Sequence, residues 1–572
     1  MLRNEHPNPQ FKRDSFICLN GEWEFSKGKY DENTPSHPCG KKITVPFCPE
    51  SVLSGIGDTS LITDCVYSRE VELTSGDLQF RLVLHFGAVD YFAVVYVNGQ
   101  KACEHIGGYT AFEVDVSPYV KVGTNRITVA VHDDVREDVP SGKQSKLEKS
   151  HGCFYTRSTG IWQTVWLEKT PTKYIKSVKF FTRSDFQSVD VELRTSDCGE
   201  AAVKVFFEGK LVGAANGKVD HRNTFNVALS EIHPWEIGKG NLYDVEITFG
   251  QDKVYSYFGL RTVKYHGRKF LLNGKSVFQR LVLDQGYYKD GIYTAKNADS
   301  FADDIKLSMS LGFNGARLHQ KVFEQRFLYE CDKAGYLTWG EFPSWGMRYE
   351  NLNSLGVFAA QWSEAVEQYF NHPSIITWCP LNEVWEDLDN NKLVRDVRFV
   401  EAVYLMTKAL DGTRPCVDAS GGYHGRYTDV FDFHNYHLSG DTARYVEDIN
   451  SKDVLSMDKT YAPDFACEHI PYDGKLPLIA SEYGGIKLCG GNSGCWGYHS
   501  VASEDDFVKE YIAATTAYLS CDKICGFCYT QLYDVEQEQN GLYNYLREKK
   551  LSDDAIAKIR ACNLQVAAIE KL

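Results

Sequence analysis

The sequence has little positive charge for its length. Its 572 residues include 62 Lys and Arg against 77 Asp and Glu, which gives a formal net charge of −15. Nucleic acids and anionic membranes attract proteins that carry a basic surface. The composition therefore disfavours nucleic acid and membrane as partners, and it indicates a neutral or small ligand.

Long hydrophobic runs are also missing. No apolar stretch approaches the roughly 20 residues that span a membrane, and the first residues, Met1 to Pro7, lack an apolar segment of signal-peptide length. We therefore expect a cytoplasmic protein. The 17 cysteines agree with this expectation, because they are odd in number and spread over the chain, which is typical of reduced thiols rather than a disulfide framework.

Signatures of metal and nucleotide binding are absent too. Cys521, Cys525 and Cys528 lie close together without a paired CxxC, and this spacing argues against zinc. The glycine-rich stretch 484–494 has neither GxGxxG nor a GK[ST] ending, so it is better interpreted as an active-site loop. No other His and Asp cluster has metal-ligand spacing, which disfavours a metal-dependent hydrolase or lyase. We expect no cofactor and no metal.

The sequence does contain a change in secondary-structure pattern near residue 265. Before residue 170, alternating strand-like segments such as 93–97 and 126–131 are separated by turn pairs, a pattern typical of a jelly-roll β-sandwich. The following β-rich stretch has the length of an immunoglobulin-like β-sandwich. After it, short apolar strands alternate with amphipathic helices, as in βα repeats. We therefore expect three domains, 1–170, 171–264 and 265–572.

The third domain is predicted to be a (β/α)8 TIM barrel, whose active site is built at the C-terminal ends of its strands. The predicted strands lie near 277–283, 315–318, 337–340, 375–381, 415–418, 430–433, 478–481 and 524–529. The predicted helices lie near 299–311, 323–334, 357–370, 392–410, 504–520 and 552–569.

Two apolar runs of this barrel end in a glutamate. One leads to Asn382 and Glu383 after the fourth strand, and the other leads to Glu482 after the seventh. Pairing with an arginine or a helix N-terminus would explain one such glutamate, but two carboxylates desolvated at one rim without a task would cost stability. Two facing carboxylates predict hydrolysis of a glycosidic bond, and the Asn382 amide is suited to hydrogen-bond a sugar 2-hydroxyl.

Several further segments resemble glycoside hydrolase family 2, the family of β-galactosidases, β-glucuronidases and β-mannosidases. The resemblance covers nearly the whole chain. It is carried by Leu-Asn-Gly-Glu-Trp at 19–23, Gly-Ile-Trp-Gln-Thr-Val-Trp-Leu-Glu at 160–168, Tyr-Phe-Gly-Leu-Arg at 257–261, Gly-Phe-Asn-Gly-Ala-Arg at 312–317, and His-Pro-Ser-Ile at 372–375 leading to Asn382-Glu383.

The resemblance implies a retaining, exo-acting glycosidase in which Glu383 is the general acid/base and Glu482 is the nucleophile. Such an enzyme holds its two carboxyl groups only ~5 Å apart. Arg317 resembles the family's arginine near the nucleophile, where a cation favours an ionised carboxylate, although structural pairing is an equal alternative. Tyr436 after the sixth strand is the candidate donor to Glu482, unless it is an ordinary rim aromatic.

Two segments depart from the family pattern. His319 stands one position earlier than the family's histidine, so its role there stays open. Asp284 and Gln285 replace the family's first-strand His-Glu pair, and they are candidates for substrate contact, with a capping or turn role as the alternative. Three further rim aromatics could stack on a pyranose face or pack in the core: Trp345, Trp385 and Trp496.

The sugar is less determined than the chemistry. The family's β-glucuronidases carry an Asn and Lys motif beyond the last strand, where this sequence has only residues 539–542, Gln-Asn-Gly-Leu. We therefore expect β-galactosidase-type activity on small glycosides or oligosaccharides. β-Glucuronidase activity, with Lys321 or Arg547 as the cation, is the alternative, as is pentopyranoside or galactofuranoside specificity.

An alternative from another class is a non-catalytic carbohydrate-binding protein on the same fold. Such a protein has no need for a nucleophile, so the presence of both Glu383 and Glu482 argues against it. Composition does not decide between a monomer and a homo-oligomer.

Overall fold

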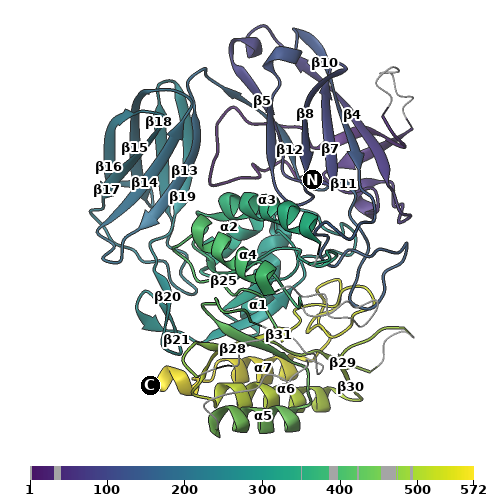
Figure 1. Cartoon of the computed structure of the whole chain (residues 1–572), viewed down its shortest axis with the longest axis vertical. Coiled ribbons are helices and arrows are strands. Elements are labelled where there is room, and N and C mark those ends of the chain that lie inside the picture. Colours follow the sequence, from purple (N-terminus) through teal and green to yellow (C-terminus); the bar gives the residue numbers. More distant parts are fainter. Residues whose placement is uncertain are drawn as a thin grey trace.

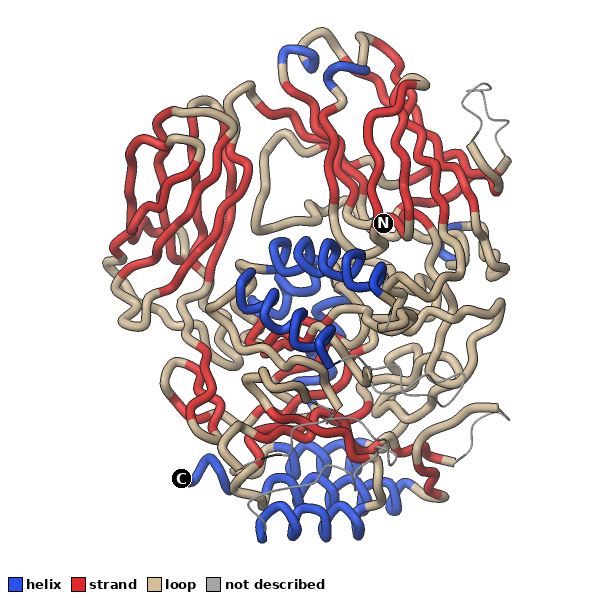
Figure 2. Tube along the Cα trace, in the orientation of Figure 1, coloured by secondary structure: helices blue, strands red, loops and turns tan. Residues whose placement is uncertain are grey.

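The computed structural model describes residues 3–30, 40–349, 351–384, 397–421, 424–451, 472, 474–489 and 494–572. The chain forms an N-terminal jelly-roll β-sandwich, an immunoglobulin-like β-sandwich and a (β/α)8 TIM barrel, as the sequence predicts (Figure 1). Both sandwiches lie above the barrel in this view. Figure 2 shows that the helices gather around the barrel, whereas the sandwiches consist of strands and loops apart from short helical turns. None of the described helices combines the length and the apolar character needed to cross a membrane.

The N-terminal sandwich packs two main antiparallel sheets on one core. Side chains alternate between buried and exposed along its strands, as in β2, where Trp23 and Phe25 point into the core and Glu22 points outward. The larger sheet runs β3 (Lys41–Val45), β2 (Gly21–Lys27), β4 (Asp64–Leu73), β10 (Gly123–His132), β7 (Phe92–Val97), β8 (Gln100–Ile106). The smaller runs β1 (Ile17–Cys18), β12 (Val165–Thr170), β5 (Arg81–Phe86), β9 (Phe112–Asp115), and β11 (Gly160–Ile161) pairs with β6 (Val89–Asp90).

The second sandwich has a three-stranded and a four-stranded sheet. The first runs β13 (Ile175–Thr182), β14 (Ser188–Thr195), β17 (Arg222–Ala228), and the second β16 (Lys210–Val219), β15 (Gly199–Phe207), β18 (Tyr243–Phe249), β19 (Asp252–Phe258). Arg261, just after β19, donates to the carbonyl oxygens of Pro373 and Ile375 at 2.8 and 2.9 Å. This sandwich therefore fixes the start of the barrel strand whose far end carries Glu383. A small sheet of β20 (Val263–His266), β21 (Lys269–Leu272) and β22 (Lys275–Ser276) follows.

The barrel strands are buried along their whole length, because helices cover the outside and side chains fill the inside. Their order is β26 (Ile375–Cys379), β25 (Leu337–Glu341), β24 (Gly315–Leu318), β23 (Gln279–Asp284), β31 (Ile524–Thr530), β28 (Leu478–Gly484), β27 (Phe431–Asn435). The sequence predicts all seven to within a few residues. Strand β28 runs three residues further than predicted, so Glu482 lies within it.

The predicted fifth strand, 415–418, pairs on one side only in the described part of the barrel. Trp378 donates its backbone N–H to the Pro415 carbonyl at 3.0 Å, and Val417 donates to the Trp378 carbonyl at 2.9 Å. Toward β27 the described residues form no regular ladder: the Asp429 N–H donates to the Cys416 carbonyl at 3.0 Å, and the His424 ring lies 3.0 Å from the Asp432 carbonyl oxygen. The barrel thus closes through a segment that is extended but not a regular strand.

The described helices are α1 (Asp299–Ser310), α2 (Gln325–Ala334), α3 (Leu352–Tyr369), α4 (Val397–Leu410), α5 (Ser439–Ser451), α6 (Glu504–Leu519) and α7 (Asp553–Asn563). Helix α3 begins before the predicted residue 357, because the Asn351 side chain caps it. Helix α5 was not predicted. Helix α7 ends earlier than the predicted residue 569, because Arg280 takes up the carbonyl oxygens of Asn563 and Gln565 at 2.6 and 2.7 Å.

The N-terminal sandwich and the barrel share a continuous core. Tyr109, Tyr155 and Trp162 of the sandwich belong to the same buried cluster as the barrel strands. Helix α3 lies directly beneath the sandwich in Figure 1, and Thr110 donates to Glu364 of that helix at 2.6 Å. The sandwich is therefore part of the packing that surrounds the barrel mouth.

Candidate active site

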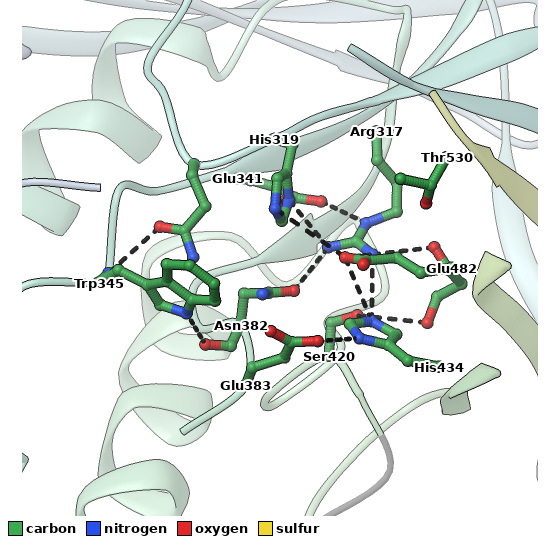
Figure 3. Close-up of polar contacts among 12 residues, drawn as sticks. Arg317, His319, Glu341, Trp345, Asn382, Glu383, Ser420, His434, Glu482 and Thr530 are labelled. Carbon is green, nitrogen blue, oxygen red and sulfur yellow. Dashed lines mark hydrogen bonds and ion pairs between the residues drawn. The ribbon is translucent and has the colours of Figure 1, made fainter. Parts of the chain in front are cut away.

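The two predicted glutamates lie side by side at the barrel mouth (Figure 3). Glu383 follows β26 and Glu482 lies near the end of β28, and parallel barrel strands bring their C-terminal ends to one rim. One carboxylate oxygen of each glutamate and a ring nitrogen of His434 lie within 4.8 Å of one another. The sequence-based expectation that Glu383 and Glu482 face each other agrees with this geometry.

Glu482 is held by a cation and a hydroxyl. Arg317 donates to its Oε1 at 3.0 Å, and the Tyr436 hydroxyl donates to its Oε2. Burial alone would raise the pKa of Glu482, but the charges of His434 and Arg317 outweigh burial and lower that pKa to about 2. The carboxylate of Glu482 is therefore ionised at neutral pH, as a nucleophile requires.

Arg317 is fully buried at the centre of this network. Its Nε donates to Glu341 at 2.5 Å, and its Nη2 donates to the Asn382 side-chain oxygen at 2.9 Å. The His319 ring lies 3.0 Å from the other Glu341 oxygen, and burial lowers the pKa of His319 well below its usual value, so the ring is neutral. Glu341 was not predicted, although it ends an apolar run, 337–340, in the same way as the predicted pair.

His434 connects the two glutamates and was not predicted either. Its Nδ1 lies 2.5 Å from Glu383 Oε1, and its Nε2 lies 3.4 Å from Glu482 Oε1 and 3.0 Å from the Ser420 hydroxyl. Burial alone would lower the pKa of His434, but the charges of Glu482 and Glu383 outweigh burial and raise it. The sequence feature that could have identified His434 is its position near the end of β27, two residues before Tyr436.

Two amide side chains offer hydrogen bonds at this mouth. The Asn382 Nδ2 is buried without a partner among the described residues, while its Oδ1 is held by Arg317. Both amide atoms of Gln285 are likewise buried and unpartnered within the described ranges. Buried polar groups normally find partners, so these amides are suited to receive the hydroxyl groups of a sugar.

Asp284 has the turn role that the sequence left as an alternative. Its Oδ1 accepts hydrogen bonds from the Gly286 N–H at 2.9 Å and the Tyr533 hydroxyl at 2.5 Å. Burial, followed by the charge of Asp304, raises the pKa of Asp284 to about 6. No hydrogen bond or ion pair in the described structure joins Asp284 to Glu383 or Glu482, so the geometry favours Gln285 over Asp284 for substrate contact.

The two cations suggested by the sequence are occupied elsewhere. Lys321 donates to the carbonyl oxygens of Gly286 and Tyr293 at 2.5 and 2.8 Å. Arg547 pairs with Asp304 at 3.0 Å. Neither cation is therefore placed to bind a charged sugar beside the glutamates.

The three tryptophans differ in their surroundings. Half-buried Trp345 donates from its indole N–H to the Asn382 carbonyl at 2.9 Å. Half-buried Trp496 donates to the Gly152 carbonyl at 2.6 Å. Trp385 lies outside the described residues. Trp345 thus contacts the residue before Glu383, and Trp496 joins its loop to the loop that contains Gly152.

Within the described ranges, two sets of side chains are close enough to share a metal ion, and neither was predicted. One is Glu383, His434 and Glu482, and the other is the exposed set Cys198, Asp220 and His221 in the immunoglobulin-like sandwich. In the first set the Arg317 guanidinium already lies 3.0 Å from Glu482 Oε1, and a second cation on that oxygen would be repelled. Cys521, Cys525 and Cys528, where the sequence argues against zinc, are buried and form no disulfide in the described part of the chain.

Comparison with protein families gives two matches. Residues 55–171 match the sugar binding domain of glycosyl hydrolases family 2, and residues 263–518 match the TIM barrel domain of the same family. Both segments of one family architecture therefore occur in the expected order.

The similar proteins and the similar solved structure are all named β-glucuronidases. The chain is 26% identical to the β-glucuronidase of Homo sapiens over 466 residues, 74% of this chain and 69% of that protein. It is 25% identical to the β-glucuronidase of Streptococcus agalactiae over 533 residues, 82% and 83% of the two chains. The structure of a Bifidobacterium dentium β-glucuronidase complexed with coumarin-3-O-glucuronide matches with a TM-score of 0.80 at 20% identity, covering 97% of this chain and 98% of that one.

Proposed function

Because this chain belongs to glycosyl hydrolases family 2, we propose that it is an exo-acting retaining β-glycosidase whose preferred substrates are β-glucuronides. The observation that carries the retaining mechanism is the approach of the two carboxylates, whose nearest oxygens lie within 4.8 Å. Inverting enzymes separate their carboxyl groups by about 6.5–9.5 Å to admit a water molecule, and retaining enzymes by about 5–5.5 Å.

In the first step, Glu482 attacks the anomeric carbon and forms a glycosyl ester. Arg317 and Tyr436 keep this carboxylate ionised and aimed, and Glu383 gives its proton to the departing glycosidic oxygen. In the second step, Glu383 takes a proton from water, which attacks the same carbon and releases Glu482. Glu383 loses a proton in the first step and regains one in the second, so the two steps together leave the proton count of the pair unchanged.

His434 contributes to both steps by holding Glu383. Its Nδ1 lies 2.5 Å from the Glu383 carboxyl group, and this contact fixes that group toward the nucleophile. The Asn382 amide, anchored by Arg317 through its oxygen, presents its free N–H groups to the sugar ring. Such a contact strengthens as the ring approaches the oxocarbenium-like transition state.

The choice of sugar rests on the relatives. Those described above are named β-glucuronidases, and this favours the glucuronide alternative over the β-galactosidase activity expected from the sequence. The expectation rested on the missing Asn and Lys motif beyond the last strand. That motif is one way to bind a uronate, and another cation at the mouth would serve the same purpose.

Trapping the covalent intermediate tests the proposal. The protein is incubated with activated 2-deoxy-2-fluoro glycosides of glucuronic acid, glucose and galactose, and the labelled peptide is identified by mass spectrometry. We expect fastest labelling by the glucuronide, on the peptide that bears Glu482, and no labelling of Glu482→Gln. Faster labelling by the galactoside would overturn the choice of sugar, and the absence of any adduct would overturn the retaining mechanism.

A further inference from the structure

A loop of the N-terminal sandwich, residues 141–145, reaches the barrel mouth. Gly142 donates its N–H to the carbonyl oxygens of Pro343 and Trp345, at 3.1 and 3.0 Å. Its φ is +59°, and a Cβ at this position would lie 2.8 Å from the Pro343 Cβ. This close approach requires glycine. The next residue, Lys143, therefore lies next to the barrel.

The backbone around Lys143 is held on its other side too. Tyr155 donates its N–H to the Lys143 carbonyl at 2.8 Å, and Ser145 donates to the Tyr155 carbonyl at 2.8 Å. The Gln144 side chain donates to buried Asp90 at 2.7 Å. The position of Lys143 is therefore fixed before any substrate arrives.

The Lys143 side chain is buried, with 6% of its surface exposed. Its ammonium lies 5.4 Å from the ring of Trp345 and 5.8 Å from the ring of Tyr155. In the part of the chain that the structure describes, no hydrogen bond or ion pair to this ammonium is found. Lysine is almost never fully buried unless it is paired, so the site is built to hold a cation for an incoming ligand.

The charges around this ammonium show where it lies. Burial alone would lower the pKa of Lys143, but the charge of Glu538, together with those of Glu482 and Glu383, raises it. Lys143 in turn is among the charges that lower the pKa of Glu482. The ammonium lies 5.4 Å from the ring of Trp345, whose indole donates to the Asn382 carbonyl beside Glu383, and 5.8 Å from the ring of Tyr155, whose hydroxyl donates to Glu538.

Glu538 does not neutralise this lysine through a direct ion pair. Its Oε2 accepts a hydrogen bond from the Tyr155 hydroxyl at 2.6 Å, and its Oε1 accepts one from the Asn540 amide at 3.1 Å. These neutral donors satisfy both oxygens. The three N–H groups of Lys143 stay available for a ligand.

We propose that Lys143, delivered by the N-terminal sandwich, binds the carboxylate of the uronic acid substrate and is the residue that selects a uronide over a neutral glycoside. This inference rests on the proposed glucuronidase function. In this arrangement the anomeric carbon of the sugar is at Glu482, and its carboxylate is at the ammonium of Lys143. Lys143 would thus bind the carboxylate in place of the missing Asn and Lys motif, although it comes from the N-terminal sandwich rather than from the segment beyond the last strand.

The test compares matched sugars that differ only in this carboxylate. The kcat/KM of the full-length protein is measured on p-nitrophenyl β-D-glucuronide and β-D-glucoside, and on the corresponding β-D-galacturonide and β-D-galactoside. The variants are Lys143→Met, Lys143→Arg and, as a control on the same loop, Lys146→Met, whose lysine pairs with Glu137 at 3.7 Å on the surface. Near-ultraviolet circular dichroism checks that each variant is folded.

We expect Lys143→Met to lower the ratio of uronide to neutral kcat/KM about 10- to 150-fold, because a charged hydrogen bond of about 1.5–3 kcal/mol is lost. Lys143→Arg should keep most of the ratio, and Lys146→Met all of it. Any effect of Lys143 on the ionisation of Glu482 acts on both sugars alike and cancels in the ratio.

The outcomes separate the two proposals. A wild-type ratio well above one that Lys143→Met leaves unchanged would overturn the role of Lys143 and leave the glucuronidase function standing. A wild-type ratio below one would overturn the glucuronidase function, and a further fall in Lys143→Met would still support Lys143 as the carboxylate-binding residue. A rise or no change in that case would overturn both.

Discussion

Replacing Arg317 by methionine should destabilise the barrel more than any surface change. Arg317 is fully buried and donates to Glu341 at 2.5 Å and to Glu482 at 3.0 Å, so its loss leaves two buried carboxylates without their cation. Breaking a buried ion pair in this way costs about 3–5 kcal/mol. Methionine replaces the aliphatic part of the arginine side chain, which limits the loss of packing.

The expected shift in melting temperature follows from the size of the cooperative unit. A barrel of about 300 residues has an unfolding entropy of roughly 0.6 kcal/mol/K, since each residue contributes about 2.1 cal/mol/K. A cost of about 4 kcal/mol then lowers Tm by about 6 °C. Differential scanning calorimetry at one scan rate and pH 7.5 measures this shift, with Arg444→Met on α5, where the arginine side chain is 83% exposed, as the control.

The shift should also depend on pH. The pKa of Glu482 is lowered to about 2, so in the wild type its ion pair stabilises the fold fully above about pH 4.5 and is lost only as the pH falls toward 2. In Arg317→Met the same carboxylate loses a cation, its pKa rises, and protonation in mild acid relieves the unpaired charge. The difference in Tm should therefore be smaller at pH 5 than at pH 7.5.

A second substitution separates the effect of the unpaired charge from the effect of lost packing. Adding Glu482→Gln to Arg317→Met removes one of the two orphaned charges, and it should restore part of the lost stability, as a double-mutant cycle would show. A single variant that melts within about 1 °C of the wild type at pH 7.5, or a Tm difference that does not change with pH, would refute this account of the network.

Three further substitutions test other parts of the mouth. His434→Asn should lower kcat/KM about 10- to 100-fold, because a charge-assisted bond to the acid/base is lost; steady-state kinetics should show no such loss for exposed His437→Asn, and equal rates would contradict the bridging role. Tyr436→Phe should reduce kcat/KM about 10-fold or more by removing a donor to the nucleophile, and unchanged kinetics would make this tyrosine an ordinary rim aromatic. Gly142→Ala should cost about 1–3 kcal/mol in thermal unfolding, because its φ is +59° and its Cβ would strike Pro343; an unaltered Tm would show that the loop yields.

Local sequence patterns were enough to predict most of the barrel. Each strand is a short apolar run because parallel strands are buried on both faces, and Glu383 and Glu482 were visible as charges at the ends of such runs. Asn382 and Tyr436 followed from their positions after strands of the same rim, whereas Arg317 followed from the resemblance to the family. The helix α5 was missed because its segment, 439–451, is mostly polar and buries only a few side chains such as Val446 and Ile449.

The residues that the sequence did not reveal act through contacts between distant segments. His434 looks like one more polar residue at a strand end until it is seen 2.5 Å from Glu383. Lys143 lies in a loop of another domain, and nothing local predicts that its ammonium is buried at the barrel mouth. Conversely, Lys321 and Arg547 have suitable charge and position in the sequence, but backbone carbonyls and Asp304 occupy them.

The contact between Gly142 and Trp345 has a consequence for how the molecule is made. About 200 residues separate these partners along the chain, and a ribosome adds about 5–20 residues per second, so the loop waits roughly 10–40 s for the barrel segment it covers. The sandwich can fold during that interval and offer a finished edge. The residues at the barrel mouth can then pack against a sandwich that is already folded. A barrel expressed without residues 1–170 would lack these contacts at its mouth.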